Sequence, residues 1–286
     1  IKSIEWFDSR FYRLTIGDEV KYFPSVTTKL NVINKPYLAE WRGSIGNREA
    51  DLRVFESSER GTRIHYAWYV LTTGGAVIYQ PNQRPNYAKE EIDQFYRDFG
   101  GNITLMRWQD EMYDAVKLMR WHELVKPKVL DSELIVYSIA HAEAGTADKI
   151  MDIEEGDYAV NGGELLTLPK GRYVVDLKTG KMGDDDSFMQ LAAYAACYEE
   201  MGSGEIKGGL IIHTQAKTKK AIEGLSTLYR TKDGLRQDYE DYRHVSAIWE
   251  RKFGSMRPRV FEFPSMLVLK KENEKENEKE NEKENE

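Results

Sequence analysis

The chain has very little cysteine and no long apolar run. Cys197 is the single cysteine among 286 residues. One thiol excludes an intramolecular disulfide, a zinc site built from thiolates, and an iron–sulfur cluster held by four cysteines. No apolar run reaches the roughly 18 residues that a membrane span needs, and the first residues lack the pattern of a secretory signal. These absences predict a cytoplasmic protein, or in a eukaryote an organellar (mitochondrial) one, that does not enter a membrane.

A phosphate-binding loop of the Gly-x-x-x-x-Gly-Lys-Ser/Thr kind is also absent, so we expect no bound nucleotide and no motor of that type. A strong positive charge is lacking too, because the net charge is −7. The last sixteen residues are four copies of Lys-Glu-Asn-Glu from Lys271 onward, and their eight Glu and four Lys carry −4 of this charge. The rest of the chain is therefore close to neutral and can still hold a basic groove.

What is present divides the chain into three parts. Residues 1–126 have the patterns of short strands followed by helices, residues 127–268 are rich in β-forming runs, and residues 269–286 form a polar tail that we expect to be disordered. In the first part, Ser25 is placed to cap a helix that runs to about Ile33. The predicted strands there are 11–14 and 20–23, and the predicted helices are 36–44, 47–73 and 103–125.

The second part predicts a mixed sheet. Its β-rich runs are 133–140, 145–153, 172–178 and 209–214, with a possible edge strand at 260–263. A helix at 186–200 lies between the third and fourth runs, Gly162-Gly163 suits a hairpin turn, and a last helix covers 233–252. This order predicts an α/β (α+β) fold with a mixed central sheet flanked by helices, in one integrated domain. Cys197 falls in the first of these helices and is expected to be a small core residue.

Asp176 and Lys178 stand at the end of the third run, directly before Thr179-Gly180. Alternate residues of a strand share a face, so both side chains point the same way and Leu177 points to the other side. Burying an acid and a base at a strand end is costly unless they pair or have a task. Taken alone, the Asp-x-Lys pattern is more often a structural ion pair than a catalytic one.

A second acid, Asp148, lies in the preceding run. If the two strands pair, Asp148 and Asp176 converge, and two close carboxylates repel unless a cation joins them. Oxygen ligands of this kind suit Mg²⁺ or Mn²⁺, one or two ions. Lys178 cannot be a ligand while protonated, but it can orient a water or neutralise charge on a phosphate.

Further candidates surround this pair in the sequence. Gln190 and Tyr194 have the i, i+4 spacing that puts them on one face of the predicted helix. His65 follows Arg60-Gly61-Thr62-Arg63-Ile64 on the long helix, and Glu133 opens the first β-run. For each of these the ordinary alternative is a core or surface residue without a chemical role.

Taken together, these motifs resemble the PD-(D/E)XK nuclease superfamily, in its RecB-like exonuclease branch. That branch is marked by His, then Gly-x-x-Asp, Asp-x-Lys and Gln-x-x-x-Tyr, which stand here as His65, Gly145 to Asp148, Asp176 to Lys178, and Gln190 to Tyr194. The run Pro24-Ser25-Val26-Thr27-Thr28, followed by Lys35-Pro36, Leu38, Trp41 and Gly46, is similar to the mitochondrial genome maintenance exonuclease group and related phage nucleases. The connection 152–170 between the two acids is longer than is usual in the family.

The resemblance implies a metal-dependent DNA exonuclease that acts on single-stranded or flap ends in replication, recombination or repair, with any helicase supplied by a partner. It implies that the N-terminal helices pack over the active site and that a single strand threads beneath them. The metal would be held by His65, Asp148, Asp176 and the backbone carbonyl of Leu177. Glu133 would serve a second ion or orient water, Lys178 would assist the attacking water, and Gln190 and Tyr194 would support the catalytic strand or touch DNA.

Contacts to DNA are the least specific prediction. Candidates for phosphate contacts are Arg42, Arg63 and Lys217, with Lys219 and Lys220 beside the last of these. Each of these lysines is as readily explained by surface solubility, and most of the aromatic residues of 36–126 are expected to be core. The alternative to a nuclease is a nucleic-acid-binding or assembly protein that kept the fold without catalysis. An acidic protein whose charges only form salt bridges would not account for five motifs in order.

Overall fold

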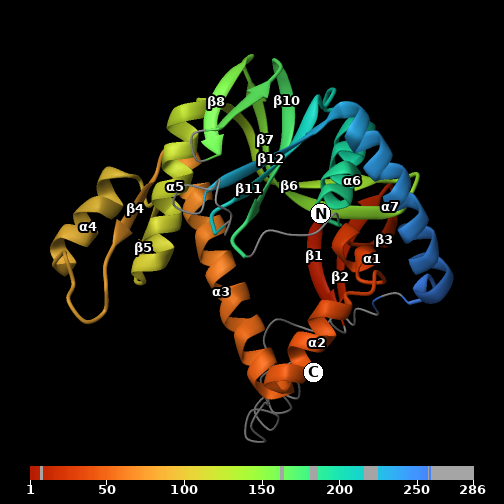
Figure 1. Ribbon diagram of the computed structural model, residues 1–286, viewed down its shortest axis with the longest axis horizontal. Helices are drawn as coiled ribbons and strands as arrows, with labels where there is room; N and C mark the ends of the chain where they lie inside the picture. The colour runs from red at the N-terminus through yellow and green to blue at the C-terminus, as the bar shows by residue number, and fades with distance from the viewer. Residues whose placement is uncertain (7–8, 162–163, 181–185, 216–224, 257, 259–286) are drawn as a thin grey trace, which may run out of the picture. The chain divides into compact units, whose positions relative to one another are not determined.

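Five strands form a mixed central sheet in the order β12-β11-β10-β7-β6 (Figure 1). The strands β10 and β11 run parallel, and the other neighbouring pairs are antiparallel. A parallel pair needs a long crossover connection, and the helix α6 (Asp186–Glu200) supplies it between β10 and β11. The mixed α/β sheet with an antiparallel portion was predicted correctly. The strand bounds are β6 (Lys128–Ser138), β7 (Glu143–Ile153), β10 (Gly171–Lys178), β11 (Gly208–His213) and β12 (Ser226–Thr231).

This computed structural model describes residues 1–6, 9–161, 164–180, 186–215, 225–256 and 258. Residues 1–256 form one compact unit, which carries the first sequence region and the second region as far as Met256. The predicted turn at Gly162-Gly163, the edge strand at 260–263 and the tail at 269–286 lie outside the described residues. In the described part of the chain, no helix has both the length and the apolar composition that a membrane crossing requires.

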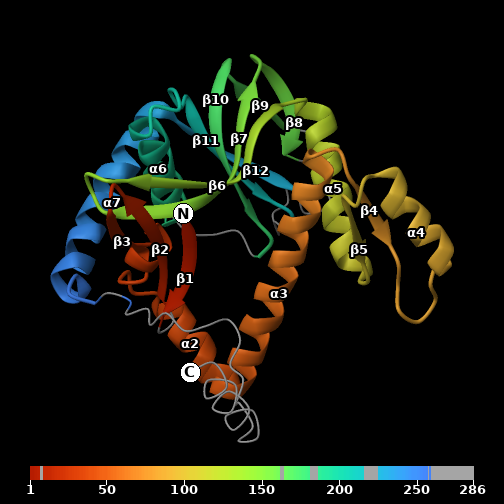
Figure 2. The same ribbon diagram turned by 180° about the vertical axis from the view of Figure 1, so that it is seen from behind.

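Helices cover both faces of the sheet, and its inner strands β7, β10 and β11 are largely buried on both sides. Val174 of β10 packs into a core with α6 and α7 (Lys232–Phe253), which also contains Cys197. Tyr173, Val175 and Leu177 face the opposite core, formed with α3 (Asn47–Thr72) and α5 (Gln109–Val125). Figure 2 shows the same layers from behind, with α3 and α5 on one side of the sheet and α6 and α7 on the other. The predicted core position of Cys197 is confirmed.

An N-terminal three-stranded sheet precedes these layers: β1 (Lys2–Trp6), β2 (Ser9–Ile16) and β3 (Glu19–Pro24). Ser25 caps the helix α1 (Val26–Leu30), as predicted, because its Oγ accepts from the Thr28 N–H at 2.9 Å. The helix ends before the predicted Ile33, which packs against the core from the following turn. The buried Lys29 then pairs with Glu143 of β7 at 2.9 Å and ties α1 to the central sheet.

The prediction of a helix over 103–125 was wrong at its start. Ile103–Met106 is a strand, β5, which pairs in parallel with β4 (Ala76–Tyr79), and α5 begins only at Gln109. Ile103 and Met106 are both buried, and their i, i+3 spacing is that of one helix face, although in the strand the two side chains point to opposite sides. The helix α4 (Lys89–Asp98), which has no fully buried residue, and the hairpin of β8 (Gly156–Asn161) and β9 (Glu164–Leu168) complete the unit.

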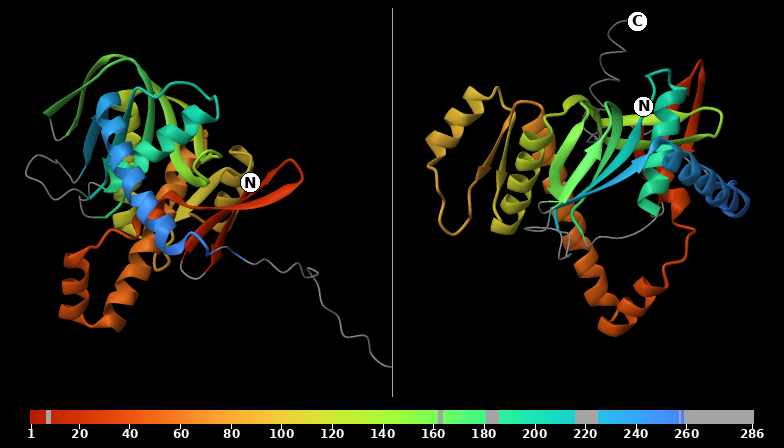
Figure 3. Two further views of the ribbon diagram at one scale, coloured as in Figure 1. Left: turned by 90° about the vertical axis from the view of Figure 1, so that its right-hand side faces the viewer. Right: turned by 45° about the horizontal axis from the view of Figure 1, so that its top comes forward.

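The helices α2 (Pro36–Ile45) and α3 lie within one residue of their predicted bounds. They meet at Gly46, whose φ of 85° suits the sharp change of direction between them. Figures 1 and 3 show the two helices forming a V whose open side faces the sheet. Residues of both helices line one cavity together with residues at the carboxyl end of β10.

Candidate active site

The site lies where β7 and β10 separate. Their last ladder pair is Val175 with Lys149, so the next residues, Asp176 and Asp148, are no longer bonded through the backbone. In place of the ladder, the Asp148 Oδ2 atom accepts a hydrogen bond from the Leu177 N–H at 2.8 Å. The carboxylate of Asp148 thus satisfies a strand donor and is fixed beside Asp176, as the predicted pairing of the two acids requires.

Asp176 and Lys178 form an ion pair in which Lys178 Nζ lies 2.8 Å from Asp176 Oδ2. Gln190 of α6 connects to both partners: its Nε2 donates to Asp176 Oδ1 at 3.3 Å, and its Oε1 accepts from Lys178 Nζ at 3.4 Å. The same Nε2 donates to the hydroxyl of Tyr194 at 3.1 Å. The structure therefore brings four predicted residues into one chain of contacts at the end of β10.

Gly145 explains why the Gly-x-x-Asp and Gln-x-x-x-Tyr motifs occur together. A Cβ atom at Gly145 would lie 2.1 Å from Cε1 of Tyr194, so only glycine leaves room for that ring against β7. Tyr194 is buried, and its position in turn holds Gln190 over Asp176. Both motifs therefore have a packing role in addition to any chemical one.

A second group of donors lies on the other side of Asp148. The ligand atoms of His65, Glu133 and Asp148 all lie within 4.8 Å of one another. His65 reaches the site from α3, and its Nδ1 is 3.4 Å from Asp148 Oδ2. Two donors on one Mg²⁺ or Mn²⁺ ion, each at about 2.1 Å, can be at most about 4.2 Å apart, so only a small adjustment would be needed to bind an ion.

Glu133 reaches this group through a strained backbone. It stands between Ser132 and Leu134, which pair with Lys149 and Ala147, so it lies opposite Asp148 across β6 and β7. Its φ is +53°, a left-handed conformation that is rare for a residue other than glycine and that tends to occur at functional sites. The sequence named Glu133 as a candidate, but nothing in it indicated this conformation.

The protonation of the acids reflects their crowding. Burial raises the pKa of Asp176, and the nearby Asp148 adds to this, while Lys178 opposes both. Burial and then Asp148 likewise raise the pKa of Glu133. Burial acts on Asp148 too, but His65 and the Leu177 N–H outweigh it, so the pKa of Asp148 is lowered. A divalent cation would relieve the repulsion among the three carboxylates.

His65 gives a testable pH dependence. Burial disfavours its charged form, but Asp148, with Asp176 and Glu133, overcomes this and raises the pKa of His65 from 6.5 to about 8. The protonated ring therefore stabilises the metal-free fold by about 2 kcal/mol below pH 6.5, and this contribution is lost as the pH rises through about 8. Urea unfolding in EDTA at pH 6 and pH 8.5 should show this fall in the wild type and not in His65→Asn. Equal pH dependence in the two proteins would contradict the assignment.

A cavity of about 1350 Å³ joins these groups to the helical cover. The donors His65, Glu133 and Asp148 line it together with Asp176, Lys178 and Gln190. The opposite wall comes from α2 and α3. Its apolar and aromatic members are Tyr37, Leu38, Trp41, Val54, Tyr66 and Tyr69, of which Tyr37 (54%) and Tyr66 (52%) are the most exposed, and Arg53, Ser57, Ser58, Gly61 and Thr62 lie among them.

Sequence reasoning missed most of this wall. It named Leu38 and Trp41 in the motif that follows Lys35-Pro36, and it covered Tyr66 and Tyr69 only among the aromatic residues of 36–126. It did not name Tyr37 or Val54. The available signal was apolar residues on α2 and on the first half of α3 that no core cluster of the described residues takes up.

Arg42 and Arg63, the two predicted phosphate contacts that lie in the described part of the chain, are not among the cavity's described lining residues. Arg63 makes a two-pronged ion pair with Glu111 of α5, at 2.7 Å and 3.1 Å, and lies over the Trp108 ring. Arg42 pairs with Asp51 at 2.7 Å and links α2 to α3. Both guanidinium groups thus have structural partners that the sequence did not indicate, and Lys217 lies outside the described residues.

Comparison with known proteins assigns no family. No protein-family model matches the chain, and no curated protein matches it at a significant level. The resemblance to the PD-(D/E)XK superfamily therefore rests on the motifs and on the site that they form.

The residues present fit a divalent cation. The donors are one imidazole nitrogen and three carboxylates, a set that suits Mn²⁺ or Mg²⁺. Asp176 Oδ2 is buried and, among the described residues, is engaged only by the Lys178 ion pair, so it retains lone pairs for an ion. His65, Glu133, Asp148 and Asp176 could therefore hold the metal, and Leu177, whose carbonyl is a predicted ligand, also lines the cavity.

Proposed function

We propose that this protein is a divalent-metal-dependent DNA exonuclease of the PD-(D/E)XK type that hydrolyses phosphodiester bonds at single-stranded or flap ends. The observation that carries the proposal is one cavity that joins the donors His65, Glu133 and Asp148 to the Asp176–Lys178 pair. An ion pair with only a structural purpose would not need a histidine and two further acids around it. Four acidic or metal-binding groups at one point are best explained by a cation.

In the proposed chemistry the metal ion activates the water, and protein side chains supply charge and positioning. A bound Mg²⁺ or Mn²⁺ would lower the pKa of a water and polarise the phosphate that it attacks. Lys178 contributes a positive charge next to the site. Burial lowers the pKa of its ammonium, but Asp176 and Asp148 together outweigh burial and raise the Lys178 pKa, so the group stays protonated. Gln190 holds Asp176 and Lys178 in place through one hydrogen bond to each.

Single-stranded DNA is the substrate that fits the opposite wall. The cavity volume of about 1350 Å³ exceeds the roughly 300–1,000 Å³ of typical small-molecule pockets, which favours a polymer. Exposed aromatic side chains such as Tyr37 and Tyr66 can stack on unpaired bases without regard to sequence. A duplex hides its bases, so it would leave this wall without a partner.

The proposed binding mode predicts a shallow dependence on salt. Among the described lining residues, Arg10, Arg53 and Lys178 are the arginines and lysines, and His65 is assigned to the metal. Single-strand binding has a slope of about −0.7 per neutralised phosphate in a plot of log K against log salt, so three contacts give about −2. Fluorescence anisotropy with a labelled oligonucleotide, Ca²⁺ in place of Mg²⁺ and a range of KCl concentrations measures this slope. A slope near −5 would mean that basic residues elsewhere carry the affinity.

The proposal is tested by cleavage of 5′-labelled and 3′-labelled DNA, single-stranded and duplex, in Mg²⁺, Mn²⁺ or EDTA. We expect metal-dependent degradation of the single strand, slower attack on blunt duplex, and no cleavage in EDTA. Product lengths from the two labels give the polarity. Binding of single-stranded DNA with no cleavage in any metal would instead support a nucleic-acid-binding protein that kept the fold without catalysis.

A further inference from the structure

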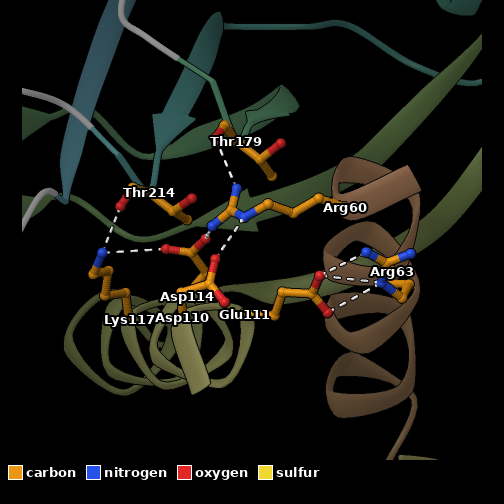
Figure 4. Close-up of polar contacts among 8 residues, drawn as sticks. All are labelled: Arg60, Arg63, Asp110, Glu111, Asp114, Lys117, Thr179 and Thr214. Atoms are coloured by element: carbon orange, nitrogen blue, oxygen red, sulfur yellow. Dashed lines mark hydrogen bonds and ion pairs between the residues drawn. The ribbon is translucent and has the colours of Figure 1, made fainter. Parts of the chain in front are cut away.

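Two cationic side chains connect the helix pair α3–α5 to the ends of the two parallel strands (Figure 4). Arg60 of α3 donates through Nη1 to the Thr179 carbonyl at 3.0 Å. Lys117 of α5 donates through Nζ to the Thr214 carbonyl at 2.6 Å. Thr179 directly follows the last residue of β10, and Thr214 directly follows the last residue of β11. Each strand end is thus held by a cation from the helix layer.

Asp114 joins the two cations at their centre. Its carboxylate pairs with Arg60 Nη2 and with Lys117 Nζ, the latter at 3.2 Å, and its residue surface is 0% exposed. Burial raises the pKa of Asp114, and the two cations oppose this. Apolar residues of similar volume often join two helices at least as well as a buried ion network, so a stability role alone explains this arrangement poorly.

The network joins the two chain segments that carry ligands of the proposed metal site. Arg60 precedes His65 on α3, and Thr179 directly follows the end of β10, the strand that carries Asp176 and Lys178. The two elements also approach closely beside it, because a Cβ atom on Gly61 would lie 3.3 Å from the Thr179 Oγ1 atom. The position of α3 along the end of β10 is therefore fixed here, within a few residues of both sets of ligands.

We propose that Arg60 and Asp114 are positioning residues that set the distance between His65 on α3 and Asp176 on β10, and so set the affinity of the site for its metal. This inference rests on the proposed function, because it assumes that these residues hold a divalent ion. Neither residue touches the ion or the substrate. They act through the Thr179 carbonyl and the placement of α3.

The same helix pair supplies two matched controls. Arg63 also joins α3 to α5, but its described contacts are Glu111, Glu59 and the Trp108 ring, none of which belongs to the central sheet. Lys117 shares Asp114 with Arg60 but holds β11, a strand that carries none of the proposed ligands. Loss of Arg63 weakens the contact between α3 and α5, and loss of Lys117 weakens the contact between α5 and the end of β11. Both variants keep the hydrogen bond from Arg60 of α3 to the end of β10.

The experiment compares Arg60→Met, Arg63→Met and Lys117→Met with the wild type by calorimetric titration of Mn²⁺ and by cleavage at increasing Mn²⁺. We expect Arg60→Met to raise the Mn²⁺ Kd by about tenfold, the lower end of the effect seen for groups that orient metal ligands. The other two variants should change it less than twofold. Activity of Arg60→Met should recover at saturating Mn²⁺, which a merely structural defect would not do. If Arg60→Met does not fold, Arg60→Lys replaces it. Lysine keeps the positive charge but cannot bond the Thr179 carbonyl and Asp114 through two separate nitrogens, so the Mn²⁺ Kd of this variant should lie between the wild-type value and the value expected for Arg60→Met.

Two outcomes are distinguishable. Equal Mn²⁺ affinity in the wild type and Arg60→Met, or equal losses in Arg60→Met and Arg63→Met, would overturn the positioning role and leave the proposed nuclease standing. A wild-type protein that binds no Mn²⁺ would overturn the proposed function and, with it, the role given to Arg60.

Discussion

Replacing Asp148 by asparagine should reduce cleavage by about 10³-fold or more. The change removes a charged donor shared by the His65 and Glu133 group, while an amide oxygen can still accept from the Leu177 N–H. Loss of the ion removes several kcal/mol of stabilisation of the transition state. Each 1.36 kcal/mol added to the activation free energy lowers the rate tenfold. The measurement is kcat on single-stranded DNA in Mn²⁺, together with the Mn²⁺ Kd.

Asp152→Asn is the control for this variant. Asp152 lies on the same strand and pairs with Arg172 at 2.9 Å, away from the cavity lining. We expect its activity to stay within a few-fold of the wild type. Similar losses in the two variants would mean that the effect of Asp148→Asn comes from the stability of β7 and not from chemistry.

Replacing Lys178 by methionine should lower kcat by about 10²–10³-fold without loss of metal binding. Its ammonium is the positive charge placed next to the acids, and removal of one such group from a preorganised site typically has an effect of this size. Lys178 is not a ligand, and it competes with a cation for Asp176 Oδ2, so the Mn²⁺ Kd should stay equal or fall.

The split between kcat and Kd is the informative readout for Lys178. Titration of Mn²⁺ into Lys178→Met, followed by cleavage at saturating Mn²⁺, separates the two quantities. A variant that loses metal binding in parallel with activity would show that the lysine is structural, and full activity in Lys178→Met would remove it from the proposed mechanism.

The centre of the site could be predicted because it depends on local rules. Strand alternation puts Asp176 and Lys178 on one face, and β10 ends at Lys178 as the following Thr179-Gly180 indicated. Helical spacing put Gln190 and Tyr194 together, and α6 has the predicted bounds Asp186–Glu200. These features need only the residues within a few positions along the chain.

The rest depends on contacts between distant segments. The partner of Arg63 is Glu111, 48 residues away, and no local pattern distinguishes a guanidinium committed to such a pair from one that is available to DNA. The position of Glu133 depends on a left-handed residue inside a strand, which only glycine or asparagine would have signalled. Arg60 and Asp114 went unnoticed for the same reason, because their importance comes from the strand ends that they reach.

A crystal structure with Mn²⁺ and a short single-stranded phosphorothioate oligonucleotide, with anomalous data collected at the manganese edge, tests the central claim most directly. We expect an anomalous peak about 2.0–2.3 Å from donor atoms of Asp148 and Asp176, with His65 or Glu133 as a further ligand and a backbone phosphate of the DNA beside Lys178. Manganese bound elsewhere, or DNA bound away from this cavity with the Asp176–Lys178 ion pair intact and no ion between the acids, would contradict it.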